Sequence, residues 1–271
     1  MRGWLVYSQE GLALNRWFAD RLLASSAAEG MDVSLHVISG DGNLQAGPLP
    51  DFVVMRAIRP DLSAMLETKG TRVLNNAETA RVANDKWETF LLAHDMGIPV
   101  MDTMRFTLPG HGSVDFPCVV KSLDGHGGSE VFLVKDAAGF AAVEATGKST
   151  FIAQPLCDEP GVDVRVYMLG GEVAAAVQRT SKTDFRSNFK LGGEAAIIHP
   201  EPEVIEMAKR LYERLKFCFA GVDFIRHGGK WVLNEIEDVV GTRMLYASGI
   251  DAARLFMRNV RSNKGLAAVF A

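Results

Sequence analysis

The first 75 residues alternate between short apolar runs and segments with helical spacing. Three apolar runs predict short buried strands at residues 4–7, 33–38 and 52–55. Between the first two strands, apolar residues recur at helical spacing from Leu14 to Leu22, and Gly30 is a typical C-terminal stop. A second, shorter helix is predicted over 61–69. This alternation predicts a small parallel α/β unit over residues 1–75.

From residue 76 onward the pattern becomes that of an antiparallel α+β domain. A long helix is predicted over 76–96, where apolar residues lie on one side and Gly97 follows. Further strands are predicted at 103–107, 117–122, 130–134, 151–156, 162–169, 173–180, 220–226 and 230–238, and further helices at 136–145, 203–217 and 251–261. We therefore expect an α+β fold with two domains, one over 1–75 and one over 76–271.

The composition of the chain limits the classes of partner that it is expected to bind. The chain of 271 residues has 29 Lys and Arg against 33 Asp and Glu, a net charge of −4. This balance argues against nonspecific nucleic-acid binding, which needs a basic surface. No run reaches the ~18 apolar residues of a membrane span, and the apolar segment near the N-terminus is too short for a secretion signal. We therefore expect a cytoplasmic protein without a nucleic-acid or membrane partner.

Three carboxylates near the C-terminus are candidates for a metal site. Glu235 and Glu237 stand two residues apart on a predicted strand, so they share one face. Asp223 is a lone acid on the preceding strand. A three-residue turn at 227–229 places it opposite residue 233 and on that face, whereas a two-residue turn places it on the other face. Such a face is more often simply solvated, but clustered carboxylates repel one another and favour a cation such as Mg²⁺, which prefers oxygen ligands.

A lysine and a glycine-rich loop suggest phosphate binding. Lys121 ends an apolar strand, and Gly125, Gly127 and Gly128 follow before the next strand. Glycines let backbone N–H groups approach phosphate oxygens, and the lysine adds a positive charge. The spacing is neither that of a Walker A loop nor that of a Rossmann fingerprint. An ordinary hairpin with a flexible loop explains the same residues equally well.

The segment 177–193 carries four basic residues together with hydroxyl and amide side chains. Its functional interpretation is an anion site in which Arg186 and Asn188 bind a phosphate. A solvated loop is the alternative.

These segments occur together, and in this order, in one known family. The chain resembles the ATP-grasp superfamily, and within it the branch typified by the ribosomal-protein glutamate ligase (RimK-type). The resemblance is carried by Leu74-Asn75, Asp85-Lys86, Val119-Val-Lys121, Gly161-Val-Asp163-Val-Arg165, Asp184-Phe-Arg-Ser-Asn188, Gly221-Val-Asp223, Asn234-Glu235-Ile-Glu237 and Gly249-Ile-Asp251. It implies an ATP-grasp fold, in which ATP lies between two α+β subdomains, preceded by a small α/β pre-ATP-grasp domain.

The resemblance also implies a set of ligand-binding residues. The nucleotide-binding positions are Lys86, Lys121, Gly125, Gly127, Gly128, Gln154, Pro155, Leu156, Asp163, Arg186, Ser187 and Asn188. Among them the two lysines would hold phosphates, Gln154 and Pro155 fall at the adenine hinge, and Asp163 falls at a ribose contact. Asp223, Glu235 and Glu237 match the magnesium positions. The implied cofactors are ATP and Mg²⁺, with two ions expected and Mn²⁺ as a substitute.

Two departures from the family pattern bear on function. The family has Glu-x-Asn at the last metal positions, where this chain has Glu235 and Glu237, and the extra charge is expected to tighten Mg²⁺ binding or to admit Mn²⁺ more readily. The stretch 238–246 replaces the family's Ser-Pro-Gly, which borders the acceptor site in relatives, so a different substrate is expected. Arg56 and Arg243 are candidates to bind a substrate carboxylate.

The implied reaction is ligation of a carboxylate to an amine. Transfer of the γ-phosphoryl group of ATP to the carboxylate makes an acyl phosphate, which the amine attacks to form an amide or peptide bond. Arg186 is a candidate for neutralising charge in the first step, and Arg179 for stabilising the oxyanion of the second, although a surface arginine would look the same.

Two other functions compete with the ligase. One is a kinase on the same scaffold that phosphorylates a small molecule without ligating an amine. The other is a non-catalytic ATP-binding module, against which the retained lysines and acids argue. The sequence leaves open whether the acid is a small molecule, a peptide or a protein tail, which amine (such as an amino acid) accepts it, and whether copies form a homo-oligomer.

Overall fold

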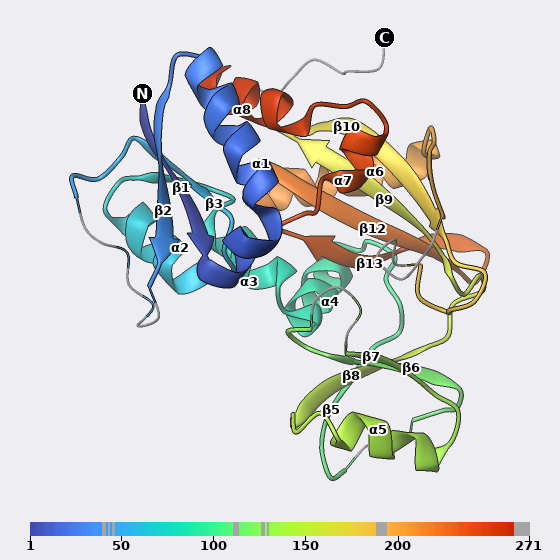
Figure 1. Ribbon diagram of the computed structural model, residues 1–271. Helices are drawn as coiled ribbons and strands as arrows, with labels where there is room; N and C mark the ends of the chain where they lie inside the picture. The colour runs from blue at the N-terminus through green and yellow to red at the C-terminus, as the bar shows by residue number, and fades with distance from the viewer. Residues whose placement is uncertain are drawn as a thin grey trace.

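A computed structural model of the chain describes residues 1–39, 42, 44, 47–110, 114–125, 128, 130–187 and 194–262. Within these ranges the strands form three β-sheets, and helices pack on them (Figure 1). Two of the expected nucleotide-binding residues, Gly127 and Asn188, lie outside the described residues. In the described part of the chain, no helix combines the length and the apolar character needed to cross a membrane.

The first sheet is parallel and is built from the N-terminal residues, with strand order β2-β1-β3-β4. Its elements are β1 (Arg2–Ser8), α1 (Gln9–Ala28), β2 (Asp32–Ile38), β3 (Phe52–Met55), α2 (Pro60–Thr68) and β4 (Arg72–Leu74). Leu62 and Leu66 of α2 are buried against one face, and Phe18 and Leu22 of α1 against the other. The predicted parallel α/β arrangement is confirmed. Only β4 lacked a signal, because three residues are too few for a periodic pattern.

The central sheet is antiparallel, with strand order β11-β10-β9-β12-β13. Its elements are β9 (Val162–Leu169), β10 (Glu172–Thr180), β11 (Glu194–Ile197), α6 (Pro202–Leu215), β12 (Phe219–His227) and β13 (Lys230–Glu237). One face packs on α6 through residues such as Val166 and Leu211. The other face carries Tyr167 and Phe219, which share a core with α1 and with the C-terminal α8 (Ala252–Ser262). This shared core joins the first sheet to the central sheet (Figure 1).

A smaller antiparallel sheet, with order β5-β8-β6-β7, lies apart from the central sheet at the bottom of Figure 1. Its elements are β5 (Met104–Thr107), β6 (Cys118–Ser122), β7 (Val131–Val134), the 3₁₀ turn η1 (Ala137–Gly139), α5 (Phe140–Glu144) and β8 (Thr150–Pro155). Phe140 and Val143 of α5 pack on Phe106 and Phe151 of the sheet. The α+β fold predicted from residue 76 onward is confirmed. The short α7 (Arg243–Ala247) was not predicted.

The long helix predicted over 76–96 is two helices, α3 (Ala77–Ala83) and α4 (Lys86–Asp95). The Asp85 side chain accepts hydrogen bonds from the backbone N–H groups of Trp87 and Glu88, and so begins α4. A short acidic side chain competes with the backbone in this way, which favours a helix start over a continuous helix. As a result Lys86 is the first residue of α4 rather than part of a helix interior.

The hairpin of β12 and β13 also differs from the predicted one. His227 pairs with Lys230, so the turn has two residues, Gly228 and Gly229, both with positive φ. The expected pairing of Asp223 with Leu233 is therefore wrong, because Leu233 pairs with Phe224. A register shift beyond this pair inserts one extra residue on β13, and Asp223 pairs with Glu235 instead. Because a β-bulge reverses the alternation of faces, the three acids share one face despite the shorter turn.

Candidate active site

Asp223, Glu235 and Glu237 meet at one edge of the central sheet. Asp223 comes from β12 and the two glutamates from β13, and one carboxylate oxygen of each lies within 4.8 Å of the others. The structure therefore brings together all three residues that the sequence predicts as metal ligands. Two arginines of neighbouring strands, Arg165 and Arg179, complete the cluster.

Arg165 of β9 bridges two of these acids. Its Nε and Nη2 donate to the two carboxylate oxygens of Asp223 at 2.7 and 2.6 Å. Its Nη1 and Nη2 donate to the two oxygens of Glu237 at 2.6 and 2.7 Å. Both edges of the guanidinium are thus engaged in bidentate pairs, which are the strongest and most directional hydrogen bonds that an arginine makes. The side chain of Arg165 is 5% exposed.

Arg179 of β10 holds the other side of the cluster. Its Nε donates to Asp163 at 2.6 Å, and its Nη2 donates to both Asp163 and Asp223. The side chain is 4% exposed, so the alternative interpretation as a surface arginine is wrong. Its Nη1 makes no hydrogen bond with the described residues, and Arg179 lines two cavities. One donor therefore stays available to a ligand.

The charges of the cluster are unequally compensated. Burial disfavours ionisation of Asp223, but Arg165 and Arg179 outweigh burial and lower its pKa to about 2. Glu235 has no ion pair within the described part of the chain, and burial together with Asp223 raises its pKa. Three oxygen donors within 4.8 Å, one of them without a cationic partner, fit a hard divalent cation such as Mg²⁺.

The expected nucleotide-binding residues line one cavity of about 100 Å³ between the central and the smaller sheet. All ten that are described contribute to it: Lys86, Lys121, Gly125, Gly128, Gln154, Pro155, Leu156, Asp163, Arg186 and Ser187. Asp163, expected at a ribose contact, is at the same time the partner of Arg179. Gln154 is held in place by a hydrogen bond from its Nε2 to Thr103 at 2.9 Å.

The two lysines enter this cavity from different elements. Lys121, at the end of β6, is buried, and its Nζ donates to the side-chain oxygen of Asn234 at 2.8 Å. Burial lowers the pKa of Lys121 to about 8, although Glu235 acts in the opposite direction. Lys86, at the start of α4, donates to the carbonyl of Gly125 in the glycine-rich loop. Both lysines therefore line the same cavity as Gly125 of the glycine-rich loop, and Lys86 contacts that loop directly.

Arg186 connects two loops across the nucleotide cavity. Its Nε and Nη2 donate to the two carboxylate oxygens of Asp184, at 3.0 and 2.7 Å. Its Nη1 donates to the carbonyl of Gly128 at 2.8 Å. The guanidinium is thus partnered by protein groups, and both Arg186 and Gly128 line the cavity.

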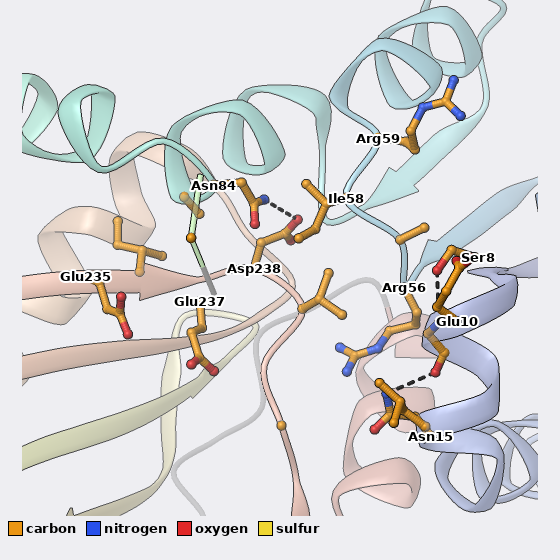
Figure 2. Close-up of a pocket in the computed structure, with 18 of the residues that line it drawn as sticks. Ser8, Glu10, Asn15, Arg56, Ile58, Arg59, Asn84, Glu235, Glu237 and Asp238 are labelled. Carbon is orange, nitrogen blue, oxygen red and sulfur yellow. Dashed lines mark hydrogen bonds between the residues drawn. The ribbon is translucent and has the colours of Figure 1, made fainter. Parts of the chain in front are cut away.

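A larger cavity of about 770 Å³ lies between the N-terminal α/β unit and the acid cluster (Figure 2). Four residues line both cavities: Lys86, Gly125, Arg179 and Glu235. Both predicted substrate residues line the larger one. Arg243 begins α7, is exposed, and donates to the carbonyl of Leu14 at 3.1 Å.

Arg56 lies at the end of β3 and is 7% exposed. Its Nη2 donates to the carbonyl of Val240 at 2.9 Å, and its guanidinium lies over the ring of Phe18. Its Nε is buried without a hydrogen-bond partner, and Arg56 forms no ion pair with a described residue. In Figure 2 the side chains of Arg56 and Glu237 extend into the cavity from opposite walls. The nearest anion that acts on it is the buried Asp238, whose pKa Arg56 lowers against the larger effect of burial, but the two form no ion pair. A ligand anion could therefore still pair with Arg56 directly.

Three features of the site were missed from the sequence. Arg165 belongs to a quoted motif but received no role, although the motif itself was a usable signal. Asp238 is buried and accepts a hydrogen bond from Asn75 at 2.7 Å and another from Asn84 at 3.3 Å, the second of which Figure 2 shows. No local sequence pattern predicts these contacts. The start of α1, where Ser8 caps the helix, also lines the large cavity, and its place there depends only on tertiary packing.

Comparison with known proteins decides the family. The sequence profile of the RimK-like ATP-grasp domain matches residues 86–260, well over half of the chain. The chain belongs to the RimK-like ATP-grasp family. It is 29% identical over 201 residues to a probable alpha-L-glutamate ligase of Haemophilus influenzae, covering 69% of this chain and 66% of the relative. It is 27% identical over 197 residues to an uncharacterized protein of Mycoplasma pneumoniae, covering 72% and 68%.

Solved structures confirm the ATP-grasp fold. A RimK domain ATP-grasp protein from Sphaerobacter thermophilus matches with a TM-score of 0.72 at 22% identity, over 96% of this chain and all of the other. D-alanine–D-alanine ligase from Bacillus anthracis, solved with ATP, matches with a TM-score of 0.73 at 16% identity, over 98% of this chain and all of the other. As a member of the RimK-like ATP-grasp family, the chain is an ATP-dependent ligase that forms C–N bonds.

Proposed function

We propose that this ligase binds ATP in the smaller cavity and joins a carboxylic acid to the amine of an amino acid in the larger one. The observation that carries the proposal is the shared boundary formed by Lys86, Gly125, Arg179 and Glu235. A phosphoryl group on one side and a carboxylate on the other would meet there, and such positioning supplies much of the rate enhancement of phosphoryl transfer.

The chemistry has two steps. A carboxylate oxygen of the acid attacks the γ-phosphorus of ATP, ADP leaves, and an acyl phosphate forms. The amine then attacks the acyl carbon, inorganic phosphate leaves, and the amine nitrogen loses a proton. Lys86 and Lys121 stabilise charge on the phosphoryl oxygens, and the unused Nη1 donor of Arg179 stabilises the oxyanion of the second step.

The acid cluster supports a Mg²⁺ site as part of this proposal. Glu235 would hold the ion, with Asp223 and Glu237 as the other carboxylates of the cluster. Bound Mg²⁺ would neutralise negative charge on the phosphates of ATP. Because ATP and Mg²⁺ are supplied together inside cells, a cytoplasmic location belongs to the same proposal.

Access of ATP requires an opening movement. A cavity of about 100 Å³ is much smaller than the roughly 300–1,000 Å³ of typical ligand sites. The hydrogen bond from Arg186 to the Gly128 carbonyl joins two residues that line this cavity, and we expect it to break when a nucleotide enters. Arg186 then becomes available to phosphate oxygens, which is the function predicted for it.

Arg56 supports an anionic group on one of the two condensing substrates. A buried arginine without a carboxylate partner is stabilised when a ligand brings the missing negative charge. Arg243, an exposed residue that lines the same cavity, would contribute a weaker and solvent-screened contact. Glutamate is the first amine to test, because the name of the Haemophilus influenzae relative points to it.

The test is release of ADP and phosphate by the purified chain with Mg-ATP, screened against carboxylic acids with and without amino acids. Release that needs both an acid and an amine, together with a condensed product by mass spectrometry, is expected. Release with one molecule alone and a phosphorylated product would establish the kinase instead. The Glu235→Gln variant is the control, and we expect its turnover to fall on the order of 10²-fold, because about 3 kcal/mol of charge stabilisation is lost.

A further inference from the structure

Arg165 binds the carboxylate by which this chain departs from its family. Where the family pattern has an asparagine, Glu237 accepts two hydrogen bonds from Arg165, one on each oxygen. Arg165 is the sole ion-pair partner of Glu237 among the described residues. The extra negative charge therefore faces an arginine at 2.6–2.7 Å.

An asparagine could not do the same. Its amide offers one oxygen acceptor and no charge, so it can accept a single bond from Arg165 but cannot form a bidentate ion pair. With Glu237 present, the guanidinium has a carboxylate on both edges, since Asp223 occupies the other. The exchange of asparagine for glutamate thus adds a counter-ion for Arg165.

The three acids are consequently not equivalent towards a cation. Both oxygens of Glu237 and both oxygens of Asp223 already accept hydrogen bonds from guanidinium groups. Glu235 accepts none from the described residues, and it lines both cavities, where phosphates and substrate would meet. A divalent cation therefore meets one carboxylate, that of Glu235, which is held by no arginine and is attracted only at longer range by Lys86 and Lys121. A positive charge, that of Arg165, already lies beside it.

We propose that the Arg165 guanidinium takes the place of one divalent cation in this site. The chain then binds a single metal ion with ATP, held by Glu235, while Asp223 and Glu237 are the counter-ions that position Arg165. This reverses the expectation that Glu237 tightens metal binding and that two ions are held. The inference rests on the proposed Mg-ATP site, and the experiment below separates the failure of one from the failure of the other.

The decisive measurement is the number of Mn²⁺ ions bound per chain. The full chain is saturated with a β,γ-imido analogue of ATP and titrated with Mn²⁺, and free Mn²⁺ is followed by its electron paramagnetic resonance signal. One bound ion is expected. Two ions whose dissociation constants lie within about tenfold of each other would overturn the inference but leave the Mg-ATP site intact. No Mn²⁺ uptake at all would overturn the site as well.

Two variants test the function of Glu237 directly. Glu237→Gln removes the counter-ion, so we expect the metal-free chain to melt at a lower temperature, while the count stays at one ion and affinity falls less than about tenfold. Glu235→Gln is expected to lose the ion at the same Mn²⁺ concentrations without a comparable loss of metal-free stability. Equal losses of Mn²⁺ affinity in the two variants would show that Glu237 is itself a ligand and would overturn the inference.

The reciprocal variant is Arg165→Lys, which keeps the positive charge but cannot hold two carboxylates bidentately. Release of Glu237 should open a second, weaker Mn²⁺ position, so the count is expected to rise above one. Glu201→Gln, in the distant ion pair with Arg226, is the matched control, and its count should equal that of the parent chain. A count of one in Arg165→Lys, with the chain folded by circular dichroism, would contradict the displacement of a cation by Arg165.

Discussion

The buried arginines at the two ends of the larger cavity differ in whether they have carboxylate partners. At one end Arg165 and Arg179 are buried, and every one of their carboxylate partners is supplied by the central sheet. At the other end Arg56 is buried to a similar degree, yet it has one backbone acceptor and no carboxylate partner among the described residues.

This difference distinguishes arginines that are paired within the fold from an arginine that is left to pair with a ligand. A buried arginine with bidentate partners has its desolvation compensated within the fold, so it positions its neighbours. A buried arginine without a partner keeps an uncompensated cost until a ligand brings an anion. The acid cluster is therefore held in place before any substrate binds, whereas our proposal is that a substrate anion completes the Arg56 end.

The largest expected effect is a loss of stability at the end of the cavity that holds the acid cluster. Arg179→Met leaves Asp163 buried without its guanidinium and removes one partner of Asp223. We expect the free energy of unfolding in urea to fall by about 3–5 kcal/mol, the usual effect of breaking a buried ion pair. The control is Lys182→Ala in an exposed pair with Glu194, which should leave the urea midpoint unchanged. Equal effects in the two variants would remove the basis of the comparison.

The next largest effect concerns Arg56, at the other end of the larger cavity. Arg56→Met removes a buried charge that has no carboxylate partner, so unfolding free energy should stay level or rise by about 1 kcal/mol. The KM for the anionic substrate should rise about 10- to 100-fold with a smaller change in kcat, because the loss is one charged hydrogen-bonded contact. A fall in stability as large as that of Arg179→Met, with KM unchanged, would show that the two ends do not differ.

A smaller effect is expected in the pH dependence of nucleotide binding. Because burial lowers the pKa of Lys121 to about 8, its ammonium loses its proton as pH rises through this value. ATP affinity, measured by calorimetry, should fall above pH 8 by up to about tenfold per unit. Lys121→Arg should show a flat profile, because arginine stays charged.

The lowered pKa of Lys121 also determines how this residue makes the stability of the folded chain depend on pH. The folded chain binds fewer protons than the unfolded chain between the lowered pKa of Lys121 and its ordinary value of 10.5. The contribution of this residue to stability therefore rises with pH across that interval. A falling contribution, measured as the difference between the parent chain and Lys121→Met, would contradict the burial of the charged group.

The smallest effect is expected for Arg243, which lines the same cavity as Arg56 but is exposed. Arg243→Ala should change KM for the anionic substrate by less than about fivefold, since exposed ion pairs contribute roughly 0–1 kcal/mol. A change as large as that of Arg56→Met would show that burial is not what distinguishes the two arginines.

Much of the fold was readable because it depends on local patterns. The strands β9, β10, β12 and β13 of the central sheet and the amphipathic α6 were each predicted close to their observed bounds, whereas the edge strand β11 was not predicted. The division of the helix at Asp85 was readable in principle, since Asp is a typical N-cap, but the apolar periodicity on both sides outweighed it. The extra residue on β13 has no comparable signal, because a bulge depends on the neighbouring strand.

By itself, the sequence determined the family, the residue types of the site and the order of its motifs, since these follow from short segments of chain. Only the tertiary structure decided which charges are partnered. Arg165 and Glu237 are far apart in the sequence, and their pairing depends on strand order and register. Arg56 has no ion-pair partner among the described residues for the same kind of reason. Which groups surround a buried charge is a property of the packed fold, because desolvation and long-range contacts arise only when distant segments come together.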